Sequence, residues 1–385
     1  MLTMEMLQDA KKVLDGVARK TPVFQSTYIN PDADVYIKCE NMQVTGSFKL
    51  RGAYFKTASL TDAEAQKGVI ACSAGNHAQG VALAAQKKGI PAVICMPESA
   101  PMAKVEATRS YGAEVVLVPG VYDDAAAKAT QLQQEKGYTF QGTVGLEIME
   151  QVKDAEVVLC PIGGGGLISG VAYAVKQINP NCKVYGVQAA GAPSMQNALN
   201  VGKAEALASV STMADGIAVK QPGDLTFAMC QKYVDGVVTV TEDEIASAIL
   251  KLIEKHKMVA EGAGAVSVAA AMYNKVDIKG KKAVCIISGG NVDVNVLDRI
   301  IDKALQANGR ITKLSVMVMD KPGQLTQLLT AIAETGANIF SVNHDRMVQD
   351  IAVSTCIVDI VAETRNKEHS EQMIEAIKAK GFTVL

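Results

Sequence analysis

Short runs of β-branched residues alternate with alanine-rich stretches over residues 67–305, and this alternation restricts the possible folds most strongly. Strands that alternate with helices in this way are typical of an α/β domain with a mostly parallel sheet. The predicted units are strand 69–72 with a helix to 87, strand 92–96 with helix 102–111, strand 114–118 with helix 123–135, strand 157–161 with a helix to 179, and strand 283–287 with a helix to 305. We therefore predict an α/β fold for this region.

Loops rich in glycine and polar residues follow three of these strands. They span residues 73–77, 163–166 and 288–291. In an open parallel sheet, ligands bind beyond the carboxyl ends of the strands. We therefore expect the three loops to meet at one crevice.

The tetraglycine Gly163, Gly164, Gly165 and Gly166 leaves a predicted strand and enters a predicted helix. Its backbone N–H groups and the helix dipole can bind an anion at close range, and phosphate is the expected guest. No Gly-Lys-Ser/Thr follows, so a nucleotide-binding P-loop is disfavoured. The G-x-G-x-x-G spacing also fails, because its last position falls on Ile168 or Ser169, so dinucleotide binding is disfavoured too.

The last 75 residues have a different pattern. They predict strand 314–319, helix 324–335, strands 338–343 and 351–360, helix 367–380 and strand 382–385. This βαββαβ order is the ferredoxin-like arrangement. Asn308-Gly309 is the expected linker, so we predict one domain over residues 1–307 and a second over 311–385.

Composition and charge exclude several partners. With 38 basic and 40 acidic residues the net charge is −2, which disfavours nucleic acid as the main partner. Residues 1–12 mix charged and apolar side chains, unlike a signal peptide, and apolar runs such as 92–96 are far too short to cross a membrane. We expect a cytoplasmic protein with no membrane partner.

The cysteines and histidines indicate no metal centre. Eight cysteines lie far apart without a C-x-x-C pair, which predicts reduced thiols in the core. Only four histidines are present, and no zinc-binding spacing occurs.

Two further segments are ambiguous on their residues alone. The stretch Ser73-Ala74-Gly75-Asn76-His77 could bind a carboxylate at a helix start, or it could be an ordinary serine cap and turn. His77 by itself is more typical of a structural histidine. Lys49 is one of many lysines, and neither composition nor spacing distinguishes it.

Taken together, these segments resemble the threonine/serine dehydratases of the β-family (fold type II) pyridoxal-phosphate enzymes. The motifs are Gly46-Ser47-Phe48-Lys49-Leu50-Arg51-Gly52-Ala53, Ser73-Ala74-Gly75-Asn76-His77, Pro161-Ile162-Gly163-Gly164-Gly165-Gly166-Leu167 and Ser288-Gly289-Gly290-Asn291. They occur in the family's order within residues 5–306. The tail, with Asp320-Lys321-Pro322-Gly323-Gln324-Leu325 and Gly336-Ala337-Asn338-Ile339, resembles an ACT regulatory domain.

The resemblance implies a tryptophan synthase β-like catalytic region of two subdomains, the smaller at about residues 47–145, followed by an ACT domain. It implies that Lys49 holds pyridoxal 5'-phosphate as a Schiff base, with Phe48 against the ring and Ser288 facing the ring nitrogen. Gly163, Gly164, Gly165, Gly166 and Leu167 would hold the phosphate, and Asn76 would bond the ring hydroxyl. The segment Ser73, Ala74, Gly75, Asn76 and His77 would bind the substrate, with Lys49 and Ser73 as catalytic residues.

The implied reaction is dehydration and deamination of L-threonine to 2-oxobutanoate and ammonia, or of L-serine to pyruvate and ammonia. Lys49 would remove the Cα proton as general base. Three alternatives remain: a serine racemase, a β-replacement enzyme, and an amino-acid sensor with an inactive catalytic region. The ACT resemblance further implies an amino-acid or nucleotide effector near Asp320–Leu325, with isoleucine or valine as candidates, and a homodimer or homotetramer.

Three departures from the family pattern bear on these expectations. Ala74 stands where racemases carry a second serine that serves as the opposite acid, which disfavours racemisation. Gln188 stands where metal-dependent relatives carry a glutamate ligand, which argues against a metal. Between Phe140 and Gln141 relatives carry about a dozen more residues, including a His-Pro-Phe-Asp segment; either the chain truly lacks this loop, or the given sequence omits its residues.

Overall fold

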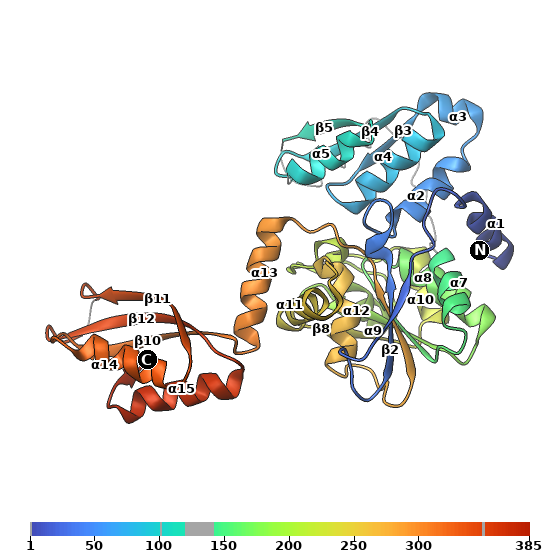
Figure 1. The fold of residues 1–385 in the computed structure, drawn as a ribbon. Helices are drawn as coiled ribbons and strands as arrows, with labels where there is room; N and C mark the ends of the chain where they lie inside the picture. The colour runs from blue at the N-terminus through green and yellow to red at the C-terminus, as the bar shows by residue number, and fades with distance from the viewer. Residues whose placement is uncertain (1, 101, 120–141, 349–350) are drawn as a thin grey trace. The chain divides into compact units, whose positions relative to one another are not determined.

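The computed structural model describes residues 2–100, 102–119, 142–348 and 351–385, and contacts divide the chain into two compact units. The units are Met1–Val294 and Asn295–Leu385 (Figure 1). This division falls where helix α13 (Val294–Ala307) begins, whereas the sequence predicted a linker where that helix ends. The predicted helix 123–135 and the shortening between Phe140 and Gln141 lie outside the described residues.

A six-stranded sheet forms the body of the first unit. Its strand order is β1-β2-β9-β6-β7-β8, and all neighbours are parallel except β1 and β2. The strands are β1 (Val23–Ser26), β2 (Asp34–Cys39), β6 (Val157–Pro161), β7 (Lys183–Ala189), β8 (Gly236–Val240) and β9 (Lys282–Ile287). Because β6 and β9 are neighbours, the loops that follow them emerge at the same sheet edge.

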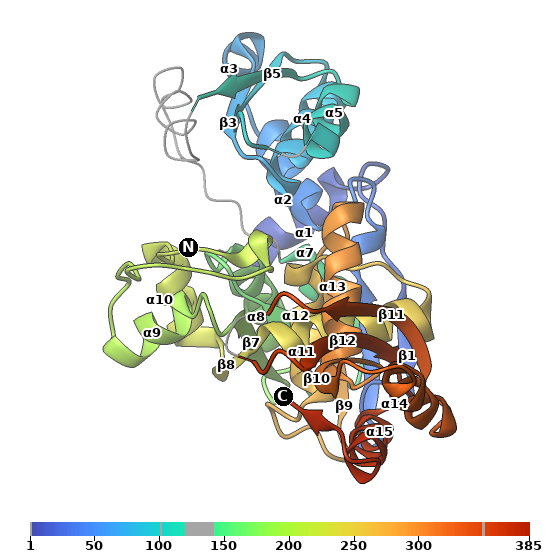
Figure 2. The same ribbon diagram turned by 90° about the vertical axis from the view of Figure 1, so that its left-hand side faces the viewer.

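A second, three-stranded parallel sheet forms a smaller layer of the same unit, seen in Figure 2 with α3, α4 and α5 beside it. It consists of β3 (Val69–Cys72), β4 (Ala92–Pro97) and β5 (Glu114–Val118). Alanines from α4 and apolar residues of β4 form its own hydrophobic core. The α/β prediction is therefore confirmed, with the predicted strands divided between two sheets.

Helices cover both sheets of the first unit. They are α1 (Met4–Val13), α2 (Lys49–Ala58), α3 (Asp62–Lys67), α4 (Asn76–Lys88), α5 (Met102–Ser110), α7 (Thr143–Gln151), α8 (Gly166–Ile178), α9 (Ser194–Val201), α10 (Asp224–Tyr233), α11 (Glu242–Lys251) and α12 (Gly262–Met272). Short 3-10 turns lie at η1 (Glu40–Met42) and η2 (Asp215–Ile217), and a π-helical turn, η3, at Leu252–His256. Among the described helices, none combines the length and apolar character needed to cross a bilayer.

Four buried charges connect α2 to the large sheet. Arg51 of α2 donates to Glu40 at 2.8 Å through two nitrogens and to Glu147 of α7 at 2.6 and 3.1 Å. Lys38 of β2 is fully buried and donates to Glu147 at 2.5 Å. Burial opposes ionisation of Glu40, but the charge of Arg51 and its hydrogen bonds prevail, so the pKa of Glu40 is lowered. The positive charges of Lys38 and Arg51 thus balance the negative charges of Glu40 and Glu147. This network lies close to Lys49 in the sequence, because Arg51 is only two residues further along α2.

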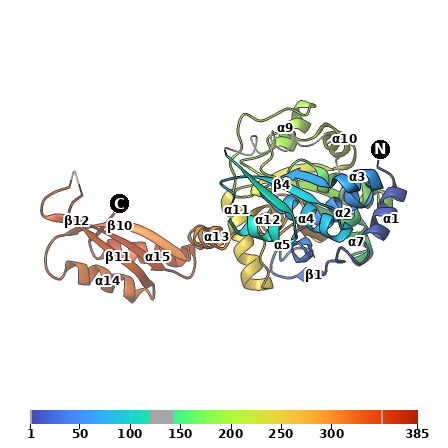
Figure 3. The ribbon, with the colours of Figure 1, turned by 90° about the horizontal axis from the view of Figure 1, so that it is seen from above.

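The second unit contains a four-stranded antiparallel sheet in the order β11-β12-β10-β13. Its elements are β10 (Ile311–Met319), α14 (Gln324–Glu334), β11 (Asn338–Asp345), β12 (Thr355–Glu363), α15 (Lys367–Ala379) and β13 (Thr383–Val384). Both helices pack on one face of the sheet around Leu328, Ile332 and Met373 (Figure 3). The predicted βαββαβ order is confirmed.

Several strand boundaries differ from the prediction, and two strands of the second unit show the largest differences. The predicted strand 351–360 begins only at Thr355, because Thr355 donates its backbone N–H to Ala352 and closes a turn there. The strand predicted at 314–319 already begins at Ile311. In addition, β1, β2, β7 and β8 were not predicted.

Candidate active site

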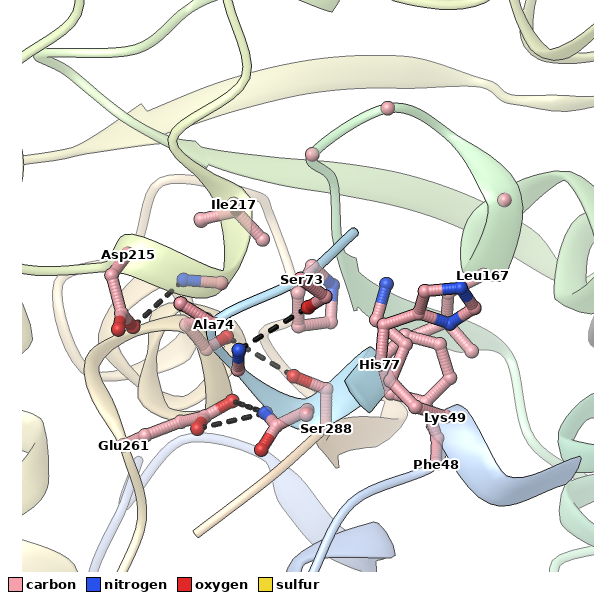
Figure 4. Close-up of a pocket in the computed structure, with 18 of the residues that line it drawn as sticks. Phe48, Lys49, Ser73, Ala74, His77, Leu167, Asp215, Ile217, Glu261 and Ser288 are labelled. Atoms are coloured by element: carbon pink, nitrogen blue, oxygen red, sulfur yellow. Dashed lines mark hydrogen bonds between the residues drawn. The ribbon is translucent and has the colours of Figure 1, made fainter. Parts of the chain in front are cut away.

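A cavity of about 620 Å³ lies between loops that follow β3, β6 and β9. This volume is within the roughly 300–1,000 Å³ typical of small-molecule sites. All residues that the sequence proposed for the site line it: Phe48, Lys49, Ser73, Ala74, Gly75, Asn76, His77, Gly163, Gly164, Gly165, Gly166, Leu167 and Ser288. Figure 4 shows how the side chains of Phe48, Lys49, Ser73, Ala74, His77, Leu167 and Ser288 lie around the cavity. Loops from two different sheets therefore converge on one pocket.

Lys49 is the first residue of α2, and its Nζ lies 5.0 Å from the centre of the Phe48 ring. Burial lowers the pKa of the Lys49 amine, and the negative charge of Glu261 only partly opposes this effect. A larger fraction of the amine is therefore neutral than for a lysine in water. A neutral amine can act as a nucleophile or accept a proton.

The tetraglycine turn joins β6 to α8, a helix of 13 residues. A side chain at Gly165 would meet Thr226 Cβ at 2.7 Å, and the φ of Gly165 is +93°, so only glycine fits there without strain. A side chain at Gly164 or Gly166 would instead point into open space. Thr226 Oγ1 donates to the Gly164 carbonyl at 2.5 Å and holds the turn in place. The turn thus forms an open, fixed cradle that suits a phosphate at a helix start.

The Ser73–His77 loop lies between β3 and α4. Ser73 Oγ accepts a hydrogen bond from the Gly75 N–H at 3.2 Å. Gly75, the residue before α4, provides no side-chain cap, so backbone N–H groups at this helix start are available to an anion. Surrounding atoms and the charge of Lys49 lower the pKa of His77, although more than a third of that side chain is exposed in the cavity, which weakens the effect of burial. The lowered pKa favours the neutral imidazole of His77 at neutral pH.

Glu261 is a site residue that the sequence reasoning missed. It directly precedes α12, is 5% exposed, and accepts hydrogen bonds from Asn76 Nδ2 at 2.7 and 2.9 Å (Figure 4). Burial raises the pKa of Glu261 to about 7, while the bond from Asn76 opposes the rise. The signal in the sequence was a single acidic residue before a helical run in which Ser267 is the one polar residue. The partner of Glu261, however, is 185 residues away.

Two further contacts shape the walls of the cavity. Ser288 is 3% exposed, and its hydroxyl donates to the Ala263 carbonyl at 3.3 Å. Lys104 of α5 forms an ion pair with Asp215 at 2.8 Å, which joins the small layer to the body of the unit. The cavity therefore carries neutral hydroxyls, those of Ser73, Thr226 and Ser288, and charges of both signs.

These features together define a class: an α/β enzyme that holds an anionic, aromatic cofactor beside a lysine of lowered pKa. The chain belongs to the family described as "Pyridoxal-phosphate dependent enzyme", whose match covers residues 14–289. The residues present fit this cofactor, because the glycine cradle suits its phosphate, Phe48 offers an aromatic surface, and Lys49 can bond its aldehyde.

Similar proteins agree with this assignment. An L-threonine ammonia-lyase from Thermotoga maritima is 48% identical over 100% of this chain and 99% of that protein. The L-threonine dehydratase catabolic TdcB of Escherichia coli K12 is 44% identical over 76% of this chain and 94% of its own length.

Solved structures give the same result for the fold. Threonine deaminase isoform 2 from Solanum lycopersicum superposes with a TM-score of 0.73 at 38% identity, covering 78% of this chain and 87% of that one. Maize serine racemase also superposes with a TM-score of 0.73, at 34% identity, covering 79% of this chain and 98% of that one.

Proposed function

We propose that this chain is a threonine ammonia-lyase, which removes water and ammonia from L-threonine to give 2-oxobutanoate, and from L-serine to give pyruvate. The observation that carries the proposal is that Lys49, the tetraglycine cradle and the Ser73–His77 loop line one cavity. The choice of substrate is supported by the names of relatives that match over their whole length.

The same cavity supplies the groups that would hold the cofactor. Gly163, Gly164, Gly165, Gly166 and Leu167 offer backbone donors for its phosphate, and Phe48 offers a ring face. Ser288 is our candidate to face the ring nitrogen. Asn76 is our candidate to bond the ring hydroxyl, and its Nδ2 donates to both carboxylate oxygens of Glu261, which orients the amide.

When bound, pyridoxal phosphate withdraws electrons from the substrate Cα and so acidifies its proton. Lys49 is proposed as the general base, because its lowered pKa favours an amine that can accept this proton. Backbone donors of the Ser73–Asn76 turn would bind the substrate carboxylate, and Ser73 offers a hydroxyl beside them.

Racemisation is the second candidate, because maize serine racemase resembles this chain over 79% of its residues. Ala74 argues against it, since a methyl group can neither donate nor accept a proton on the opposite face. Chiral chromatography of an L-serine reaction distinguishes the two. Pyruvate should accumulate faster than D-serine, and the reverse order would favour the racemase.

For the second unit we propose an ACT-like regulatory role over residues 311–385. The βαββαβ order supports this proposal, and the segment Asp320–Leu325, where β10 leads toward α14, is the candidate effector site. An amino acid such as isoleucine or valine, or a nucleotide, would bind there in a cytoplasmic homodimer or homotetramer. An effector that shifts the threonine saturation curve would support the role, and truncation after Ala307 should abolish the shift.

The test of the proposed function is substitution of Lys49. Purified protein should absorb in the visible range and form keto acid from L-threonine, and Lys49→Ala should abolish both. Lys56→Ala is the matched control, because Lys56 lies on the same helix and is exposed. Borohydride reduction followed by mass spectrometry should find the pyridoxyl group on Lys49. Turnover that survives Lys49→Ala would reject the assignment.

A further inference from the structure

Three side chains with different ligand atoms meet at one end of the sheet in the second unit. They are Asp320, His344 and Cys356, and one ligand atom of each lies within 4.8 Å of the other two. Asp320 follows β10, His344 lies on β11 and Cys356 lies on β12. The three elements are neighbours in the sheet, with β12 in the middle.

The strand register explains why these side chains meet. Cys356 pairs with Val318 of β10, and His344 pairs with Val358 of β12. Directly paired residues share a face of the sheet, as do residues two apart on one strand. Asp320, Cys356 and His344 therefore lie on the same face. The arrangement follows from the backbone pairing of three strands, not from the chance position of flexible surface groups.

The ligand atoms are already close to a metal-binding geometry. His344 Nε2 lies 3.0 Å from Cys356 Sγ. Two ligands of a tetrahedral zinc ion, with bonds of about 2.0 Å to nitrogen and 2.3 Å to sulfur, lie roughly 3.5 Å apart. The observed separation is thus about half an ångström too short, which a small side-chain rotation corrects.

Surrounding contacts orient the ligands further. Arg346 donates to Asp320 Oδ1 at 3.0 Å, and the Asp320 backbone N–H donates to the Ser354 carbonyl at 2.9 Å. Such outer contacts commonly fix the carboxylates that bind metals. Cys356 is 1% exposed, whereas His344 and Asp320 are accessible, so an ion can enter from solvent.

From this cluster we infer a zinc-type divalent cation site formed by Asp320, His344 and Cys356, with a fourth position open to water or a small ligand. A thiolate, an imidazole and a carboxylate match Zn²⁺, whereas Mg²⁺ and Ca²⁺ prefer oxygen ligands alone. On binding, the S–H bond of Cys356 breaks, sulfur bonds the metal, and the proton leaves to solvent. Nothing is oxidised or reduced.

The inference does not depend on the proposed catalytic function. The sequence predicted no metal centre because the ligands are separated by many residues and follow no zinc-binding spacing. They become neighbours only through the strand order.

The test is equilibrium dialysis of the full-length holoenzyme against Zn²⁺ after removal of metals with a chelator. We expect the wild type to bind one zinc per chain more than His344→Ala does at the same free zinc concentration. His344→Ala should weaken this binding by at least about 100-fold, since even outer-contact losses cost about 10- to 100-fold. His344 is exposed, so this variant should fold. His256→Ala is the matched control, a histidine of the first unit that should leave zinc binding unchanged.

Cobalt provides a spectroscopic readout of the sulfur ligand. The Co²⁺-loaded protein should show a thiolate-to-cobalt charge-transfer band in the difference spectrum against its metal-free form. Cys356→Ser should remove the band, and Cys182→Ser, which alters a buried cysteine of the first unit, should retain it. Zinc binding that is equally strong in wild type and His344→Ala, or absent from wild type, would overturn the inference.

Discussion

Substitution of Glu261 by glutamine should remove a loss of folding stability that occurs in the wild type as the pH rises. This loss originates in the ionisation of Glu261 in the active-site cavity. Burial raises the pKa of this carboxyl from 4.5 to about 7. Between these two pH values the folded chain holds a proton that the unfolded chain releases. The contribution of Glu261 to stability is therefore fully present below about pH 4.5 and is lost as the pH rises through about 7.

The size of the loss follows from the pKa shift. Each pKa unit corresponds to about 1.4 kcal/mol, so a rise from 4.5 to about 7 amounts to about 3 kcal/mol. Glutamine does not titrate and resembles the protonated acid in shape. At about pH 4.5 the Glu261→Gln variant and the wild type should have similar free energies of unfolding. As the pH rises to about 8, the variant should become more stable than the wild type by about 3 kcal/mol.

The measurement is urea unfolding of both proteins across this pH range, in cofactor-free form because the bound cofactor adds its own charges. Only the difference between the two proteins is used, since other groups titrate in both. Glu106→Gln is the control, because the Glu106 side chain is 62% exposed and the substitution isolates the effect of burial. A difference between Glu261→Gln and wild type that stays constant with pH would refute the reasoning.

Two further substitutions test the framework around the cavity. Arg51→Met removes a buried cation and leaves Glu40 without its charge partner, so we expect the free energy of unfolding, measured by denaturant titration, to fall by about 3–5 kcal/mol. Arg109→Met, which breaks an exposed ion pair with Glu106, is the control and should lower the free energy of unfolding by less than about 1 kcal/mol. Gly165→Ala should greatly weaken cofactor binding, measured by visible absorbance during titration with pyridoxal phosphate, because the added methyl group strains the cradle. Gly202→Ala is the control, because Gly202 also has a positive φ, +80°, but a side chain there would point into open space. It should lower the stability of the protein without weakening cofactor binding.

The sequence predicted the regions whose structure depends on nearby residues. Strands β3, β5 and β6 begin and end at the predicted residues, because β-branched runs bounded by glycine and polar residues are strong local signals. The loops after β3, β6 and β9 lie at one cavity, as the position of ligand sites in parallel sheets suggested.

The features that were missed depend on residues distant in the sequence. Strand β2 (Asp34–Cys39) contains Lys38, and a lysine is unsuited to a buried strand unless an acidic partner neutralises it. That partner, Glu147, lies 109 residues later in the sequence. The raised pKa of Glu261 arises from burial. The hydrogen bond between Glu261 and Asn76 joins a residue beside the large sheet to one beside the small sheet. Neither contact leaves a periodic pattern in the sequence, because each joins single side chains from separate elements.

The residues on either side of Lys49 in its sequence motif fix the backbone of this lysine. Gly46 has a φ of +69°, and a side chain there would overlap Asn291, so glycine allows the two loops to approach. Ser47 forms a backbone bridge with Gly289, which brings the start of α2 to the end of β9. Arg51 then ties the same helix to the large sheet through the buried ion network. Residues on both sides of Lys49 thus fix the backbone that carries it, so substitutions at these positions should impair the placement of the amine even where its chemistry is unchanged.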